Sequence, residues 1–202
     1  MTTYICHDPS LKLRRTVLEP RLQRFGLDVT WITGYPPEDY TRGILSPQEQ
    51  SLIDKHSHAV RLLQESTDDY CLILEDDVDF TDEFPGILQS GLESAGILRN
   101  DWDILFIGGS IQNQNTLDWV GRRSNGILTI VGDDMPSQCR LTHAYVLSKR
   151  ITHRLLERMQ PPFDLAYDFL LQKILLDEHR IQAWTFPYLN QLSGRYFKSS
   201  IR

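Results

Sequence analysis

The sequence predicts a single α/β domain in which helices cover a β-sheet. Patterns typical of strands and of helices alternate along most of the 202 residues. The segment YCLILE at 70–75 is apolar almost throughout, which is typical of a strand buried on both faces of a parallel or mixed sheet. The segment 46–65 starts with a helix-capping pattern and continues with apolar residues at helical spacing. Together these features indicate a layered α/β architecture.

The N-terminal region predicts one helix between two strands. Asp8 followed by Pro9 is typical of an N-cap and a first helical residue, so we expect the helix to begin there. Pro20 interrupts the apolar stripe and predicts a kink or a restart, and Gly26 is expected to end the helix. The flanking segments are predicted as strands at 3–6 and 27–33 and a loop at 34–43.

The next helix has the clearest start signal in the chain. Ser46 can cap the helix, Pro47 suits its first turn and Glu49 completes a capping box, so a helix is predicted at 46–65. The rest of the chain continues the alternation. We expect strands at 70–75, 103–109, 126–131 and 142–148, and helices at 82–98, 149–159 and 164–179.

Composition limits the classes of function. The formal net charge of −6 argues against a general nucleic-acid binder, which needs a basic face. No apolar run approaches the roughly 20 residues that span a bilayer, and the N-terminus carries no basic segment before an apolar one. We therefore expect neither a transmembrane segment nor a signal peptide. Cys6, Cys71 and Cys139 are isolated and lack zinc-site spacing, and reduced thiols fit a cytoplasmic location.

An acidic cluster follows the apolar strand. Glu75, Asp76 and Asp77 are consecutive, and such crowding suits either a solvated turn or a divalent cation. In an extended strand Glu75 and Asp77 would point to one face and Asp76 to the other. We expect Asp77 to be the main metal ligand and Asp76 the second candidate, with Asp76 or Glu75 holding a ribose or a metal-bound water. A calcium loop is disfavoured, since Asp82 stands where an EF-hand needs glycine.

The histidines do not predict a metal site. His56 and His58 are two positions apart on the predicted helix and would not face each other. We expect His58 to be a partly buried, hydrogen-bonded helix residue or part of a pocket wall. His143 is expected either to be structural or to line the cleft, and the glycines at 108–109 would let the backbone approach a ligand closely.

The ordered set of motifs resembles glycosyltransferase family 25, which includes the lipooligosaccharide and collagen galactosyltransferases. The resemblance covers nearly the whole chain. It rests on the segments LSPQEQSLIDKHSHAVRLL with Ser57 and His58, CLILEDDVDF, WDILFIGG, THAYVLSKR, PFDLAYDFLL, and FPYLNQLSGRYFKSSI with Pro187 and Gln191.

The resemblance implies a GT-A-like fold, a Rossmann-like mixed sheet with helices on both faces. It implies an inverting, metal-dependent enzyme that moves a hexose from a UDP-sugar, such as UDP-galactose, to a glycan, lipooligosaccharide or protein hydroxyl. Mn²⁺ or Mg²⁺ would bridge the donor's diphosphate. Residues 1–110 would form the nucleotide-sugar half and 111–202 the acceptor half. Peripheral membrane contact is compatible with such acceptors.

The same resemblance suggests roles for particular residues. The uridine would dock near Cys6, His7, Thr33 and Gly34, with Arg14 on the base or the phosphates and Glu75 and Asp76 nearby. Lys198, with Arg195, would fold over the phosphates. Inversion needs a general base for the acceptor hydroxyl, and Asp164 and Asp168 are the candidates.

Two other classes of function remain open at this point. One is a metal-dependent nucleotidyltransferase or phosphate-ester enzyme that uses the same carboxylates. The other is a nucleotide-sugar-binding module without catalysis.

Overall fold

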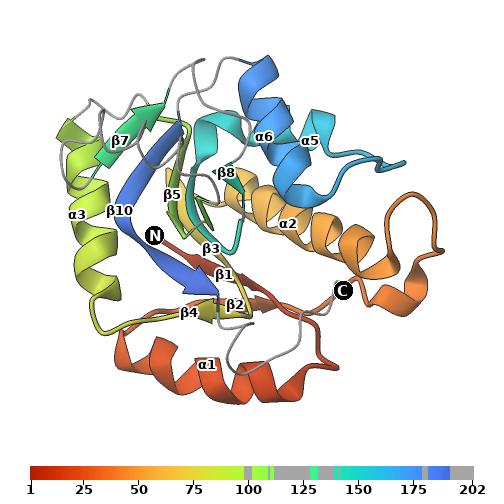
Figure 1. Ribbon diagram of the computed structural model, residues 1–202, viewed down its shortest axis with the longest axis horizontal. Coiled ribbons are helices and arrows are strands. Elements are labelled where there is room, and N and C mark those ends of the chain that lie inside the picture. Colours follow the sequence, from red (N-terminus) through yellow and green to blue (C-terminus); the bar gives the residue numbers. More distant parts are fainter. Residues whose placement is uncertain are drawn as a thin grey trace.

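The structure is a computed structural model, and it confirms the predicted α/β fold: a mixed sheet with helices on both faces (Figure 1). The residues that it describes are 1–97, 102–108, 110–111, 128–131, 139–140, 142–178 and 182–191.

The main sheet has eight strands and mixed direction. Strand β1 lies between β2 and β3 and pairs in parallel with both, whereas β9 runs antiparallel to both β3 and β5. β9 comes from the second half of the chain and lies between β3 and β5 of the first, so the two halves share one sheet. In order the strands are β2 (Val29–Ile32), β1 (Thr3–Cys6), β3 (Tyr70–Glu75), β9 (Ala144–Ser148), β5 (Ile104–Gly108), β10 (Gln182–Gln191) and β4 (Val78–Asp79), with β7 (Leu128–Val131) also paired to β10. A separate pair is formed by β6 (Ser110–Ile111) and β8 (Cys139–Arg140).

The two faces of the sheet carry separate apolar cores. Cys71 and Ile73 of β3 belong to one core and Leu72 and Leu74 to the other, as expected when successive side chains alternate faces. The first face is covered by α2 (Pro47–Glu65), α5 (Thr152–Arg158) and α6 (Tyr167–Asp177). The second is covered by α1 (Lys12–Arg24) and α3 (Phe84–Ile97). Two short 3₁₀ helices are η1 (Pro37–Asp39) and η2 (Lys149–Ile151).

The first helix begins later than predicted. Asp8 does not cap it: its Oδ1 accepts a hydrogen bond from the backbone N–H of Ser10, which makes a local turn, and α1 starts at Lys12. The restart that was one of the two expectations at Pro20 does not occur, because α1 runs through Pro20 and keeps Leu18 and Leu22 buried. The end was predicted correctly, since Gly26 has φ of 65° in a Schellman-type arrangement.

The second helix agrees with its prediction. The backbone N–H of Glu49 donates to Ser46 Oγ at 3.2 Å, and the backbone N–H of Ser46 donates to Glu49 Oε2 at 2.8 Å. This capping box fixes the start of α2 and so the positions of the side chains that α2 presents to the sheet edge.

Strand β10 was missed by the sequence patterns. Pro187 lies within it, and proline removes a ladder hydrogen bond, so the segment did not look like a strand. The structure accommodates Pro187 where the register to β5 shifts, between Trp184 and Leu189. Beyond that shift, Asn190 and Gln191 pair with β4, the short strand that follows the acidic cluster.

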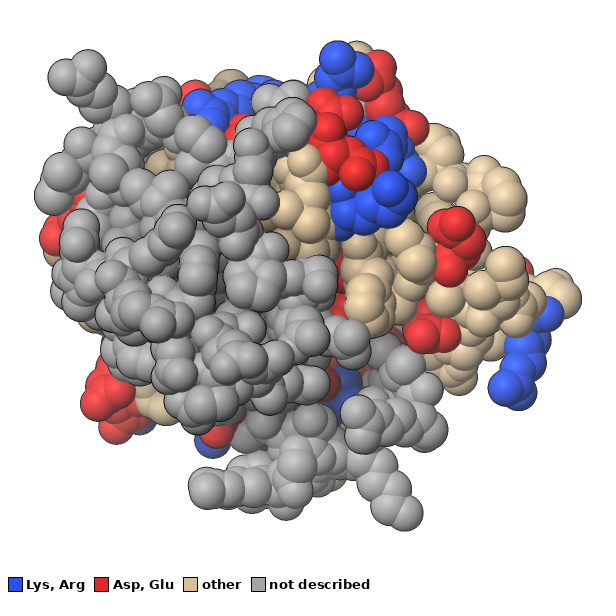
Figure 2. All heavy atoms as spheres, turned by 45° about the horizontal axis from the view of Figure 1, so that its top comes forward, with Lys and Arg blue, Asp and Glu red and all other residues tan. Residues whose placement is uncertain are grey.

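The described surface mixes both signs of charge. On the face shown in Figure 2, acidic and basic side chains are interspersed among the coloured residues. Ion pairs also join α5 to α6, for example Arg158 to Asp177 at 2.9 Å. Among the helices that the structure describes, none has the length and apolar character needed to cross a bilayer.

Candidate functional site

The carboxyl ends of three parallel strands meet at one edge of the sheet. Cys6 pairs in register with Ile32 on one side and with Glu75 on the other. The residues that follow these positions therefore emerge together, and they include His7 and Asp76. Ligands of open α/β sheets bind at such an edge.

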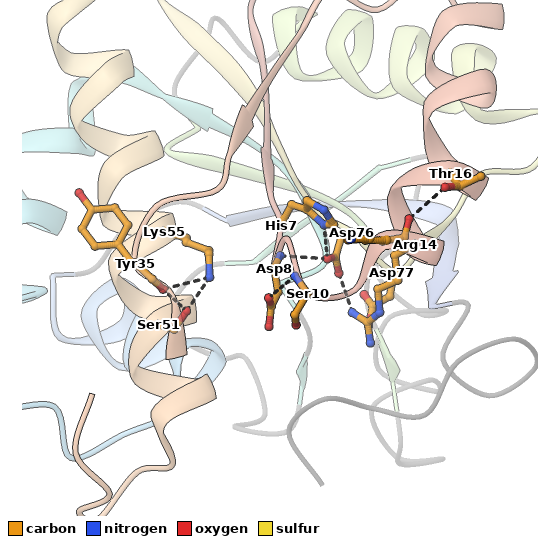
Figure 3. Close-up of polar contacts among 11 residues, drawn as sticks. His7, Asp8, Ser10, Arg14, Thr16, Tyr35, Ser51, Lys55, Asp76 and Asp77 are labelled. Carbon is orange, nitrogen blue, oxygen red and sulfur yellow. Dashed lines mark hydrogen bonds and ion pairs between the residues drawn. The ribbon is translucent and has the colours of Figure 1, made fainter. Parts of the chain in front are cut away.

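Asp76 is buried and bonded to protein donors at both oxygens (Figure 3). His7 Nδ1 lies 2.8 Å from Oδ2, and Arg14 Nη1 donates to Oδ1 at 2.6 Å. The backbone N–H of Asp8 adds a longer bond of 3.3 Å to Oδ2. Burial raises the pKa of Asp76, but the hydrogen bond from His7 and the charge of Arg14 outweigh it and keep the pKa below its ordinary value.

Asp77 is buried as well, but its contacts differ. Its Oδ2 lies 3.5 Å from Arg14 Nη1, and its Oδ1 has no hydrogen-bond partner among the described residues. Burial and the neighbouring charge of Glu75 raise its pKa to about 7. A buried carboxylate with an unused oxygen is costly to keep ionised unless a cation joins it.

The expected alternation stops before Asp77. Strand β3 ends at Glu75, and Asp76 and Asp77 form a turn that leads into β4. One guanidinium nitrogen of Arg14 therefore contacts both carboxylates, and the divergence of Asp76 and Asp77 expected for an extended strand does not apply here.

Glu75 faces the α2 side of the sheet. Thr142 Oγ1 donates to its Oε1 at 3.0 Å, and His56 Nε2 lies 3.5 Å from the same oxygen. Burial raises the pKa of Glu75 to about 6, and the charge of Asp168 acts in the same direction. Asp168 is thus electrostatically coupled to this end of the site.

A buried aromatic chain supports His56, and the sequence patterns did not reveal it. His56 Nδ1 lies 2.9 Å from Tyr145 Oη, which lies 2.7 Å from Tyr167 Oη, and the His56 ring stacks on Tyr167 with a centroid separation of 3.8 Å. His58 instead meets Tyr35 Oη at 3.2 Å. The prediction that the two histidines do not form a pair is therefore confirmed.

A pocket of about 290 Å³ lies on the α1 side of the same edge. It includes His7 and Thr33, which were predicted to contact the nucleotide, together with the cationic Lys12 and Arg15. Arg15 also stacks over the Trp31 ring, 4.7 Å from its centroid. The full lining is His7, Pro9, Lys12, Arg15, Thr16, Glu19 and Thr33. A pocket with two cations beside the start of a helix suits a phosphorylated ligand.

Other predicted site residues lie elsewhere. The Cys6 thiol is part of a buried core and its pKa is raised by burial, so it does not reach the pocket. Gly34 follows Thr33 and is exposed. Asp168 lies in the first turn of α6, but Asp164 precedes that helix by three residues, so the prediction that Asp164 begins it was wrong. Lys198 and Arg195 lie outside the described residues.

The glycine predicted to admit a ligand has another neighbour. A Cβ on Gly108 would lie 2.6 Å from His143 Nε2. Among the described contacts, Gly108 thus makes room for the buried His143 side chain, which was predicted to be structural or to line the cleft.

The residues present fit a divalent cation only as a site shared with a substrate. The described residues hold no group of three or more His, Cys, Asp or Glu able to bind a metal by itself. Asp77 offers the free oxygen, whereas Asp76 is already bonded to His7 and Arg14. Mg²⁺ in phosphate-binding enzymes is commonly held by one or two carboxylates plus substrate oxygens.

The comparison with solved structures finds likenesses, whereas the two comparisons of sequence find none. No family profile matches the sequence, and no curated protein matches it. Among solved structures, CMP:2-keto-3-deoxy-manno-octonic acid synthetase complexed with CTP is similar, with a TM-score of 0.43 and 11% sequence identity. The match covers 93% of this chain and 75% of that one.

Proposed function

We propose that this protein is a metal-dependent, inverting glycosyltransferase that uses a UDP-sugar donor, as its resemblance to glycosyltransferase family 25 implies. The observation that carries the proposal is the buried Asp77 carboxylate, whose Oδ1 has no partner among the described residues at the carboxyl edge of the parallel strands. A divalent cation that is also bound by the donor's diphosphate would give this oxygen a partner.

The donor would be held from the α1 side. Lys12 and Arg15 supply positive charge in the pocket, and His7 and Thr33 supply polar contacts for the nucleotide. Arg14 holds Asp76 and approaches Asp77, so it maintains the carboxylate geometry. Mn²⁺ or Mg²⁺, when bound by Asp77, would offset the charge of the leaving diphosphate.

The acceptor would react from the α6 side. Its hydroxyl oxygen forms the new bond to the anomeric carbon, the bond from that carbon to UDP breaks, and the hydroxyl proton passes to a carboxylate. Of the two predicted bases we favour Asp168, because it lies in the first turn of α6, whereas Asp164 precedes that helix and is exposed. The acceptor class remains a glycan, lipooligosaccharide or protein hydroxyl.

Nucleotidyl transfer is the second candidate, and the cationic pocket favours it equally. Lys12 and Arg15 would suit a nucleoside triphosphate as well as a diphosphate. The two functions differ in their products, because a glycosyltransferase releases UDP and a nucleotidyltransferase releases pyrophosphate.

One assay separates these candidates. The protein is incubated with a panel of UDP-sugars and Mn²⁺ or Mg²⁺, with and without sugar acceptors, and UDP is measured. In parallel it is incubated with CTP or UTP and sugar phosphates or acidic sugars, and pyrophosphate is measured. Acceptor-stimulated UDP release that EDTA abolishes is the expected result.

Matched variants connect the result to the site. Asp77→Asn should abolish metal-dependent release, whereas Asp82→Asn, at an exposed acid on the same segment, should leave it unchanged. Pyrophosphate as the product would replace the main proposal by the second. Absence of both products, with nucleotides still bound, would point to the non-catalytic module instead.

A further inference from the structure

Lys55 is a buried cation beside the edge of the sheet at which the parallel strands end. It lies near the middle of α2, and only 3% of the residue is exposed. Its ammonium donates to Ser51 Oγ at 2.5 Å and to the backbone oxygen of Tyr35 at 3.3 Å. Figure 3 shows this group on one side of His7 and Asp8, with Arg14 and Asp77 on the other.

Both acceptors of the Lys55 ammonium are neutral. No carboxylate of the described residues lies within ion-pairing distance of it, although the charges of Asp8 and Asp76 act on it from farther away. Burial lowers the pKa of Lys55 despite these acids. Burying a charge without a close counter-ion destabilises the folded state, and a side chain such as methionine would fill the same space without that cost.

The surrounding backbone is built to hold this ammonium. Tyr35 has φ of 61°, an unusual conformation for a residue with a side chain. Its carbonyl accepts from both Ser51 and Lys55, and its hydroxyl meets His58. Strained backbone that its neighbours hold in place in this way is common where a ligand is bound.

A Ser–Lys nucleophile does not account for the arrangement. Ser51 Oγ donates its hydrogen to the Tyr35 carbonyl at 2.6 Å, and the residue is 1% exposed. Ser51 therefore directs its proton to the Tyr35 carbonyl and not to Lys55. What these contacts leave unexplained is why a positive charge is placed at Lys55.

We propose that Lys55 binds an anionic oxygen of the substrate, on the side of the β1 end opposite to the Lys12 and Arg15 pocket. The anion is either the diphosphate of the nucleotide or the carboxylate of an acidic sugar. This inference rests on the proposed function and adds to it a residue that selects for a negatively charged group on the substrate.

Calorimetric binding separates the two sources of negative charge. The ligands are UDP, UDP-glucose, UDP-glucuronate and uridine, and the proteins are wild type, Lys55→Met and, as a surface control, Lys173→Met. Loss of one charge-assisted hydrogen bond should weaken binding by about tenfold or more. Equal weakening of the first three ligands indicates the diphosphate, and weakening of UDP-glucuronate alone indicates the carboxylate. Uridine should be unaffected.

The inference is overturned if folded Lys55→Met binds every ligand as tightly as wild type. Lys55→Gln, which can still donate to the Tyr35 carbonyl, replaces it if Lys55→Met does not fold. If wild type binds no uridine nucleotide, the proposed function is wrong. Pyrophosphate and glucuronate then test Lys55 alone: binding that Lys55→Met loses supports the inference, and no binding of either rejects it.

Discussion

Arg14 Nη1 lies 2.6 Å from Asp76 Oδ1, and both side chains are only 6% exposed. Such a buried pair depends on both partners, because removal of one leaves an uncompensated charge in a medium that solvates it poorly. Arg14 therefore stabilises the folded edge of the sheet through Asp76, in addition to contacting Asp77.

Replacement of Arg14 by methionine should be strongly destabilising. The Asp76 carboxylate would lose its main cationic partner, and breaking a buried pair costs about 3–5 kcal/mol. The measurement is the free energy of unfolding in urea. Arg21→Met is the matched control on the same helix, since Arg21 is 36% exposed and pairs with Asp79 at 3.2 Å, and it should cost less than about 1 kcal/mol. Equal losses of unfolding free energy in Arg14→Met and Arg21→Met would contradict the claim that the buried pair contributes more to stability than the surface pair.

Asp76→Asn and Asp77→Asn should change stability in opposite directions. Asp76→Asn leaves Arg14 short of a counter-charge and should destabilise the protein. Asp77→Asn removes a buried, poorly paired carboxylate and should leave stability equal or higher, by roughly 1 kcal/mol, at neutral pH without added metal. Denaturant unfolding of the two variants beside wild type provides the comparison. A large loss of stability in Asp77→Asn would mean that further contacts stabilise the ionised Asp77 carboxylate in the folded state.

Local signals in the sequence were sufficient for some elements of the fold. The start of α2 is encoded by Ser46, Pro47 and Glu49, which are neighbours, and the structure forms the expected capping box. The core strand 70–75 is encoded by its own apolar run. β10 depends on pairing with β5, β7 and β4, and Pro187 within it argued against a strand.

In the candidate site too, the sequence reveals local patterns but not contacts between residues far apart in the chain. The crowding of Glu75, Asp76 and Asp77 is visible in the sequence, and it correctly marks the end of a buried strand. Their partners are not visible, because Arg14 is 62 positions from Asp76. The burial of Lys55 was missed for a similar reason. It depends on the loop around Tyr35, and a lysine on a helix is ordinarily expected in solvent.

Gly108→Ala should destabilise the protein through a steric clash. A Cβ at this position would lie 2.6 Å from His143 Nε2 and 2.9 Å from the Ala144 side chain, both in the buried layer. Overpacking of this kind typically costs about 1–3 kcal/mol. Gly86→Ala is the control, because nothing lies within 4 Å of its added Cβ and helix propensity favours alanine. Thermal unfolding should show a lower midpoint for the first variant and an equal or higher one for the second. A neutral Gly108→Ala would mean that His143 can move aside.

His56 should contribute a loss of stability in mild acid, whereas Glu75 and Asp77, whose pKa values are raised to about 6 and about 7, contribute in the opposite direction. Burial, assisted by the charge of Lys55, lowers the pKa of His56 to about 3, whereas an unfolded chain has a histidine pKa near 6.5. Between these values the unfolded state binds a proton that the folded state does not, so this contribution lowers stability as pH falls, by about 1.4 kcal/mol per pH unit. His56→Gln should reduce the slope of unfolding free energy against pH between about pH 4 and 6. His153→Gln, at an exposed position on α5, should leave the slope unchanged. An identical slope in wild type and His56→Gln would show that His56 is not held neutral by the fold.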